Sequence, residues 1–186
     1  MIKLMIKLMT KFLLSLSSFS GVLYFFVVTN LDKQISDQTI FNLNFLANGY
    51  IRHGSYIVIF AFFAFITLVI TRKVFPKADS LEVREIKPIE SVAVPTYIGL
   101  FVIALGLNQI PMPVPFVILT VLFLFWTRLE KIFYFNPIWL FFGYRFYEVK
   151  SSNDNTYTLI TKRDRLKGEQ DFTSLRRLNN YTFLES

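Results

Sequence analysis

Long uncharged hydrophobic stretches separated by charged segments dominate the first two thirds of the chain. Stretches this apolar are typical of helices that cross a lipid bilayer, which need about 20 residues. The pattern predicts four transmembrane helices, at about residues 12–29, 55–71, 92–108 and 113–126. For the first stretch a signal peptide is the alternative, because a basic segment precedes it. The absence of a small-residue cleavage motif after it favours a retained helix.

The segments between these stretches differ in character. Segment 72–91 is charged, and within it Pro76 and Pro88 bracket DSLEVREI, where Asp79 or Ser80 is available to cap a short helix. The connection QIPMPVP, before the fourth helix, carries no charge. A connection this short and rich in proline predicts that the third and fourth helices form an antiparallel hairpin.

After the fourth predicted helix, the aromatic run from Ile132 to Tyr144 is apolar enough to suggest a fifth span. The Asn136-Pro137 pair would break a helix within the membrane, so we interpret the run as lying at the membrane surface. Tryptophan and tyrosine favour the headgroup level, and the basic side chains at the end of the fourth helix can reach it. The predicted interface collar consists of Arg128, Lys131, Trp139 and Tyr144.

The pattern changes from about Gly143 onward. A β-hairpin is predicted by two segments rich in β-branched and aromatic residues, YRFYEVK and TYTLITK, which the polar turn cluster SSNDN separates. The return strand would be at about residues 156–162. The predicted fold is a mainly α membrane protein with four transmembrane helices and a small cytoplasmic α+β domain that contains this hairpin. Residues 1–131 would form the four-helix domain, and residues 132–186 the aromatic interfacial segment and the basic cytoplasmic domain.

Charge predicts the orientation. Of the 20 lysine and arginine residues, 18 lie in the N-terminal segment, in segment 72–91 or after Trp126, and only Lys33 and Arg52 lie in segment 30–54. Basic segments remain on the cytoplasmic side of a membrane. We therefore expect a multi-pass membrane protein with both termini in the cytoplasm.

Two sets of residues are candidates for binding. The first set is basic, and the whole chain has a net charge of +7. This charge favours an acidic protein, nucleic acid or anionic lipid headgroups as a partner. The alternative is that the set is an ordinary cytoplasmic surface of a membrane protein. The members of this set are Lys162, Arg163, Arg165, Lys167, Arg176 and Arg177. The second set is Ser17 and Gly21, four residues apart, which suit a helix-packing or oligomer seam. The alternative is that the serines bond only to their own helix.

The residues needed for catalysis are missing from the pattern. The chain has no cysteine, and its only histidine, His53, lies outside the predicted spans. No acidic or basic residue interrupts the four spans, whereas ion-coupled carriers and intramembrane proteases need such groups. We therefore expect no catalytic residue, no metal site and no cofactor, and we expect that the protein is not an enzyme.

The motifs SLSSFS (residues 15–20) and NPIWLFFGYRFYEV (residues 136–149), with the predicted architecture, resemble the KwaA family. KwaA is the membrane component of the bacterial Kiwa anti-phage defence system. The resemblance implies a homo-oligomeric scaffold in the bacterial inner membrane that senses phage attack and holds KwaB, a soluble DNA-binding partner. Nucleic acid would then be reached only through that partner.

Two functional hypotheses follow. The first is a membrane anchor and sensor whose cytoplasmic side recruits a soluble effector. The second is an oligomeric pore or channel subunit, favoured by short apolar spans and a serine-rich first helix, although the chain lacks rings of charged residues for ion selection. A subunit of a larger transporter is a third class.

Overall fold

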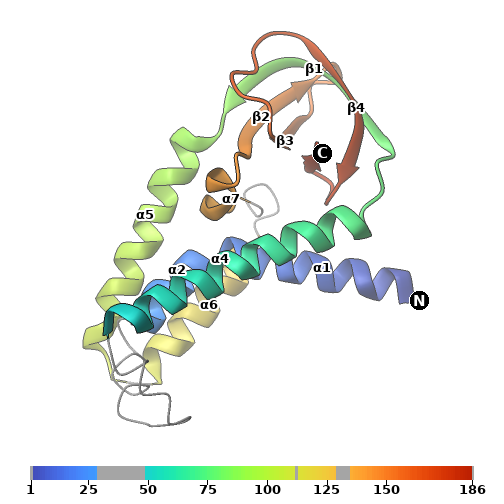
Figure 1. Ribbon diagram of the computed structural model, residues 1–186. Coiled ribbons are helices and arrows are strands. Elements are labelled where there is room, and N and C mark those ends of the chain that lie inside the picture. The colour runs from blue at the N-terminus through green and yellow to red at the C-terminus, as the bar shows by residue number, and fades with distance from the viewer. Residues whose placement is uncertain (1, 29–48, 112, 129–134, 186) are drawn as a thin grey trace.

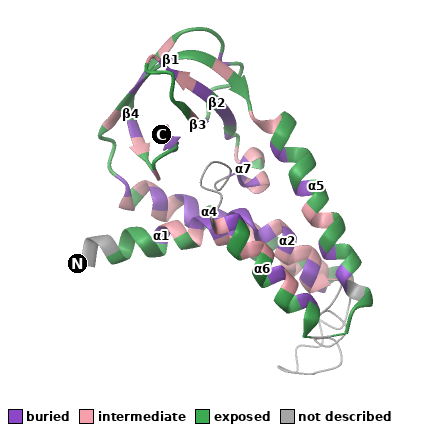
Figure 2. Ribbon diagram, turned by 180° about the vertical axis from the view of Figure 1, so that it is seen from behind, coloured by how far each residue is buried: buried purple, intermediate pink, exposed green. Residues whose placement is uncertain are grey.

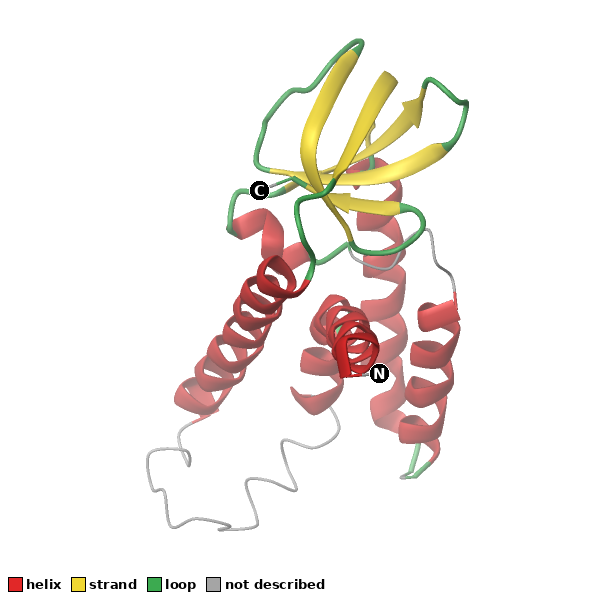
Figure 3. Ribbon diagram, turned by 90° about the vertical axis from the view of Figure 1, so that its right-hand side faces the viewer, coloured by secondary structure: helices red, strands yellow, loops and turns green. Residues whose placement is uncertain are grey.

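The computed structural model describes residues 2–28, 49–111, 113–128 and 135–185. Within them the chain forms two parts, a group of helices and a small β-barrel at one end of that group (Figures 1 and 3). Four of the five barrel strands follow the last helix in the sequence, and the remaining strand lies between two helices. The elements are α1 (Ile2–Ser18), α2 (Ser20–Phe26), α4 (Gly49–Val74), β1 (Asp79–Pro88), α5 (Glu90–Gly106), η3 (Leu107–Gln109), α6 (Val114–Arg128), α7 (Pro137–Phe141), β2 (Arg145–Ser151), β3 (Thr156–Thr161), β4 (Gln170–Arg177) and β5 (Thr182–Leu184).

The prediction of four transmembrane helices is wrong. In the described part of the chain, α4 is long and apolar enough to cross a membrane, and α1 with α2 makes a second candidate only if this pair, bent by 52°, is one broken span. The helices α5 and α6 have 17 and 15 residues. At about 1.5 Å per residue they are roughly 25 and 22 Å long, short of a hydrocarbon core of about 30 Å.

The barrel is closed, with the strand order β1-β2-β3-β5-β4. Strand β1 pairs antiparallel with β2 on one side and with β4 on the other, so it closes the circle. The short strand β5 pairs parallel to β3 and antiparallel to β4. Closure leaves no free strand edge, which protects a small sheet from pairing with other chains.

The short helix predicted in segment 79–88 is also wrong, because these residues form β1. Leu81 and Val83 point into the barrel core, whereas Glu82 and Arg84 are exposed. This alternation has the period of two that is typical of a strand with one buried face. A segment assigned to the membrane half of the chain therefore belongs to the barrel.

The predicted hairpin is confirmed. Strands β2 and β3 pair antiparallel from Arg145 opposite Thr161 to Lys150 opposite Thr156. Both faces of β2 are covered, because Phe146 packs toward the helices while Tyr147 and Val149 belong to the barrel core. The barrel therefore has an inner core of its own and an outer apolar face that packs on the helices.

The helices have buried faces and exposed faces, as the burial colouring shows (Figure 2), and many of the exposed side chains are apolar. Large side chains such as Val58, Phe62, Val102 and Phe125 are each more than 60% exposed. A continuous exposed apolar surface of this kind marks contact with another apolar phase or partner.

Candidate functional site

The first two helices meet at a sharp break. α1 ends at Ser18 and α2 begins at Ser20, with Phe19 between them. Before the break, Ser18 Oγ donates to the Ser15 carbonyl at 2.8 Å and Ser15 Oγ donates to the Lys11 carbonyl at 3.2 Å. Serine side chains that bond back to the preceding turn bend helices. The serine-rich sequence thus explains where the helix bends, and the bend makes the carbonyls of Ser17 and Ser18 accessible to other donors.

Asn136 supplies the donor for Ser17. Its Nδ2 lies 3.0 Å from the Ser17 carbonyl oxygen and 2.8 Å from Ser17 Oγ. The Thr67 hydroxyl from α4 lies 3.0 Å from the same Ser17 Oγ. All three residues are buried, so these hydrogen bonds satisfy polar groups that have no access to solvent.

Ser18 is held from the other side. The phenol of Tyr97, on α5, donates to the Ser18 carbonyl or to the Phe135 carbonyl, which lies 2.7 Å away. Trp126 Nε1, on α6, donates to Ser18 Oγ at 3.1 Å. We call this set the helix-break junction. Its members are Ser17, Ser18, Thr67, Tyr97, Trp126 and Asn136.

Asn136 also begins α7. Its Oδ1 accepts from the Ile138 N–H at 2.9 Å, and Pro137 occupies the first helical turn. This is an N-cap followed by proline, an arrangement that suits a helix start. The capped helix holds Trp139, whose Nε1 donates to the Ala64 carbonyl of α4 at 3.1 Å and whose ring stacks with Phe146 of β2. One residue therefore connects the helix break to the barrel.

A second connection lies at the end of α4. The Arg72 guanidinium donates to the Tyr144 hydroxyl and lies over the Tyr144 ring, 5.6 Å from its centroid. The Arg176 guanidinium, from β4, donates to the Phe75 carbonyl just after α4. We call these four residues, Arg72, Phe75, Tyr144 and Arg176, the barrel junction.

Burial sets the electrostatics of the barrel junction. It raises the pKa of Tyr144, although the charge and the hydrogen bond of Arg72 act in the opposite direction. Burial also lowers the pKa of Arg176, and the nearby positive charge of Arg72 adds to that effect. Two guanidinium groups thus lie close together where α4 meets the barrel.

The six predicted partner-binding residues fall into two groups. In the first, Arg163 pairs with Glu185 at 2.6 Å, Arg177 pairs with Asp79 at 3.5 Å, and Arg176 belongs to the barrel junction. These three arginines serve contacts within the chain.

The second group is Lys162, Arg165 and Lys167, in the loop between β3 and β4. All three are exposed, and none has a carboxylate at ion-pair distance among the described residues. Leu166, between two of them, is part of the barrel core. The Lys162 ammonium lies 5.3 Å from the centroid of the Tyr144 ring, so this lysine also contacts the barrel junction. The exposed Arg165 and Lys167 flank the buried Leu166, which anchors the loop.

The predicted seam and collar residues also have definite positions. Ser17 belongs to the helix-break junction, and a Cβ atom on Gly21 would lie 3.2 Å from the Phe101 ring of α5. Trp139 and Tyr144 are buried between the helices and the barrel instead of facing outward, because both make polar contacts with α4. The Arg128 side chain and the whole of Lys131 lie outside the described residues.

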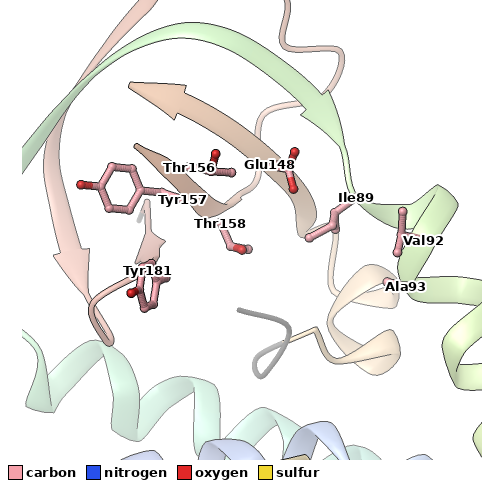
Figure 4. A pocket seen from close by; sticks show the side chains of 8 residues that line it. All are labelled: Ile89, Val92, Ala93, Glu148, Thr156, Tyr157, Thr158 and Tyr181. Carbon is pink, nitrogen blue, oxygen red and sulfur yellow. The ribbon is translucent and has the colours of Figure 1, made fainter. Parts of the chain in front are cut away.

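Figure 4 shows a pocket of about 210 Å³ between the start of α5 and strands β2 and β3, where Glu148, Thr156 and Thr158 line one side and Val92 the other. A single carboxylate beside two threonines does not form an acid–base pair or an activated nucleophile. No group of three acidic, histidine or cysteine side chains suited to a metal lies in the ranges that the structure describes.

Thr67, Tyr97 and Asn136 belong to the helix-break junction, but they were not among the site residues predicted from the sequence. Thr67 and Tyr97 are isolated polar residues within apolar helices, a pattern that indicates a buried hydrogen bond. Asn136 before Pro137 was interpreted only as a helix breaker, although asparagine followed by proline is also a helix-start signal.

A family model described as anti-phage protein KwaA matches residues 10–184. No curated protein and no solved structure matches the chain. The matched range includes the helix break, the barrel and both junctions, and it confirms the resemblance seen in the two sequence motifs. The chain belongs to the KwaA family of anti-phage proteins.

Proposed function

We propose that this anti-phage protein is a non-enzymatic membrane scaffold and sensor that recruits a soluble effector through its barrel. The effector implied by the family resemblance is a DNA-binding, KwaB-like protein. The observation that carries the proposal is a solvent-exposed cationic loop on a barrel that is bonded directly to an apolar helix long enough to cross a membrane.

Membrane attachment rests on α4. Its 26 residues would be about 39 Å long, its outer side is apolar, and Arg72 and Lys73 lie in its last turn. The basic end leads into the barrel, and basic segments remain in the cytoplasm. The barrel would therefore face the cytoplasm of a bacterial cell, where a soluble effector is available.

Recruitment rests on Lys162, Arg165 and Lys167. Cations that already form ion pairs within the chain gain little from a partner's carboxylate, because one ion pair is exchanged for another. The cations of this loop have no carboxylate at ion-pair distance among the described residues, so their attraction to an acidic surface of a partner does not require an existing ion pair to break.

Sensing rests on the two junctions. The helix-break junction ties α4, α5, α6 and Asn136 to Ser17 and Ser18 at the end of α1. The barrel junction ties the end of α4 to Tyr144, directly before β2, and to β4. A shift of α1 against α4 and α7 would break the buried hydrogen bonds that Ser17 makes with Thr67 and with Asn136, the N-cap of α7. The proposed signal is a displacement of the helices that reorients the barrel loop.

Effector capture tests the proposal. The full-length protein in detergent, or in membrane vesicles, is mixed with the soluble effector candidate, and bound protein is measured at low and high salt. The variant Lys162→Gln/Arg165→Gln/Lys167→Gln is expected to lose at least tenfold in affinity, with the larger loss at low salt.

A matched control removes the same charge elsewhere. Lys73→Gln/Lys77→Gln/Lys87→Gln replaces three exposed lysines, one in the last turn of α4, one in the connection to β1 and one on β1, where Lys87 pairs with Glu85 at 3.2 Å. This control is expected to retain capture. Equal losses of affinity in the two triple variants would mean that capture depends on general charge attraction. Unchanged capture by the loop variant would mean that the loop is not part of the binding surface.

The resemblance also implies a homo-oligomer, which stays a prediction. The alternative of a pore subunit has no specific observation in its favour, because Ser15, Ser17, Ser18 and Ser20 of the serine-rich helix are buried within the same chain.

A further inference from the structure

A basic cleft of about 170 Å³ lies where α1, the end of α4 and the turn between β4 and β5 meet. Lys7 and Lys11 line it from α1, and Arg177, Asn179 and Asn180 line it from the barrel. No carboxylate belongs to its lining. Two ammonium groups, one guanidinium and two carboxamides thus surround one small space, and all of them offer hydrogen-bond donors.

The lysine side of the cleft has unbalanced charge. Lys7 and Lys11 are one helical turn apart, so they lie on the same side of α1, and like charges at this spacing destabilise a helix. Neither has a carboxylate at ion-pair distance in the described part of the chain. An anion in the cleft would relieve this repulsion.

The barrel side is held in place by its own turn. The Leu178 N–H donates to the Thr182 carbonyl at 2.9 Å, and Asn179 Oδ1 accepts from the Tyr181 N–H at 2.8 Å. Arg177 pairs with Asp79 at 3.5 Å, but both side chains are partly exposed and a pair of this kind is weak. The guanidinium has five N–H donors, so it can contact a second anion while it keeps this pair.

The position of the cleft indicates what kind of anion it receives. Its apolar lining includes Phe75, the residue directly after α4, so the cleft lies at the level where α4 ends. On α1, next to the lysines, Met5, Leu8, Met9 and Phe12 are each more than half exposed. Lysines beside an exposed apolar surface characterise a helix that lies at the surface of a bilayer. Lipid phosphates occupy the same level.

We propose that Lys7, Lys11 and Arg177 bind the phosphate group of an anionic phospholipid in this cleft. The inference rests on the proposed insertion of α4 in a membrane. Bound lipid would connect α1 to the turn between β4 and β5, two parts of the chain that the cleft otherwise separates. The barrel would then be held at the membrane by a lipid contact in addition to the barrel junction.

Thermal unfolding of the full-length protein in a mild detergent tests the site. Three ligands are titrated separately: short-chain phosphatidylglycerol, short-chain phosphatidylcholine and inorganic phosphate. Phosphatidylglycerol is expected to raise the unfolding temperature in a saturable manner, because a ligand that binds the folded state stabilises it. Phosphatidylcholine, whose phosphate is neutralised by choline, is expected to act much more weakly.

Variants locate the effect. In Lys7→Gln/Lys11→Gln the apparent affinity for phosphatidylglycerol is expected to fall about tenfold or more, in line with the contribution of each basic residue to anionic lipid binding. Lys7→Arg/Lys11→Arg is expected to restore it. Arg84→Gln/Lys87→Gln removes the same charge from two exposed positions on β1 and is expected to leave the affinity unchanged.

Three results would overturn the inference. One is equal loss in the two glutamine variants, which would mean general charge attraction. Another is an unchanged response in Lys7→Gln/Lys11→Gln. The third is an equal effect of inorganic phosphate, which would assign the cleft to a soluble anion instead of a lipid. Retention of the protein in membranes after an alkaline carbonate wash is measured in parallel. A protein that stays in the membrane without a lipid response contradicts only the cleft, and one that is washed off contradicts the membrane insertion itself.

Discussion

The Asn136 side chain donates hydrogen bonds to both the carbonyl oxygen (3.0 Å) and the hydroxyl oxygen (2.8 Å) of Ser17, a residue 119 positions earlier in the chain. Asn136 also caps α7 through its Oδ1. Its carboxamide therefore donates to a backbone carbonyl at the helix break and also accepts from a backbone N–H at the start of α7. The helix break and the start of α7 are thus connected through one side chain.

Replacement of Asn136 by alanine is expected to destabilise the protein by about 2–4 kcal/mol. Loss of the cap contributes about 1 kcal/mol, and a buried carbonyl left without its donor contributes about 1–3 kcal/mol. The change is measured as a fall in the midpoint of thermal or denaturant unfolding in detergent. Asn153→Ala, at an exposed position in the turn between β2 and β3, is the control and is expected to change stability much less. Equal effects of the two substitutions would contradict the assigned role of Asn136.

Tyr97→Phe removes only the hydroxyl that donates to the Ser18 or the Phe135 carbonyl. The expected loss is about 1–2 kcal/mol, because the ring still fills its place but one buried acceptor loses its donor. Tyr24→Phe is the matched control, since the Tyr24 hydroxyl has no hydrogen-bond partner among the described residues while its ring packs against Phe60. If both substitutions have the same small effect on unfolding, the Tyr97 hydroxyl is not a structural hydrogen-bond donor.

Gly21→Leu is expected to destabilise the folded chain itself, by about 1–3 kcal/mol. Even a Cβ atom at Gly21 would lie 3.2 Å from the Phe101 ring, so a larger side chain forces α2 and α5 apart. Gly99→Leu, on α5, is the control, because no atom lies within 4 Å of the Cβ position there. Unfolding midpoints and native gels of both variants separate the two possible roles. A Gly21→Leu protein of normal stability that has lost its oligomers would show that the seam joins subunits instead of α2 and α5.

Stability above pH 10 is expected to depend on Tyr144. Burial raises the pKa of its phenol, so the unfolded chain releases this proton at lower pH than the folded chain does. The unfolded state then binds fewer protons above the ordinary tyrosine pKa of about 10, and stability falls as the pH rises through that value. Tyr144→Phe cannot lose the proton. It is expected to be less stable than the parent at pH 7, where it lacks the Arg72 hydrogen bond, and to approach the parent in stability as the pH rises above the ordinary tyrosine pKa of about 10. A difference in unfolding temperature that stays constant with pH would contradict this assignment.

The sequence was sufficient to predict the hairpin and the aromatic character of the segment before it, because both depend on local residue patterns. Thr156–Thr161 is rich in β-branched residues, and a polar turn precedes it. The KwaA resemblance was likewise recognisable from two short motifs. The exposed cations of the barrel loop were among the residues selected, since charge is visible in a sequence without knowledge of the fold.

Other features depend on distant partners, which a single sequence does not reveal. In segment 79–88 the same residues suit a capped helix or an alternating strand, and pairing with β2 and β4, more than 60 residues later, decides between them. The hydropathy of the sequence shows that α5 and α6 are apolar, but it does not show at which residues these helices begin and end. The pairing of Ser17 with Asn136 gave no local signal, because only the bend at Phe19 makes the Ser17 carbonyl available.

The place of β1 in the barrel has a consequence for synthesis of the protein. This strand leaves the ribosome before α5, yet its partner β4 ends only at Arg177, 89 residues after β1 ends at Pro88. Until β4 has been synthesised, one edge of β1 remains unpaired, and unpaired strand edges are prone to wrong associations. A ribosome that stalls after α7, or a protease that cuts there, leaves a product whose barrel cannot close, because β2, β3, β4 and β5 all follow α7. Truncated copies of this kind would lack the barrel and with it the cationic loop proposed to recruit the effector.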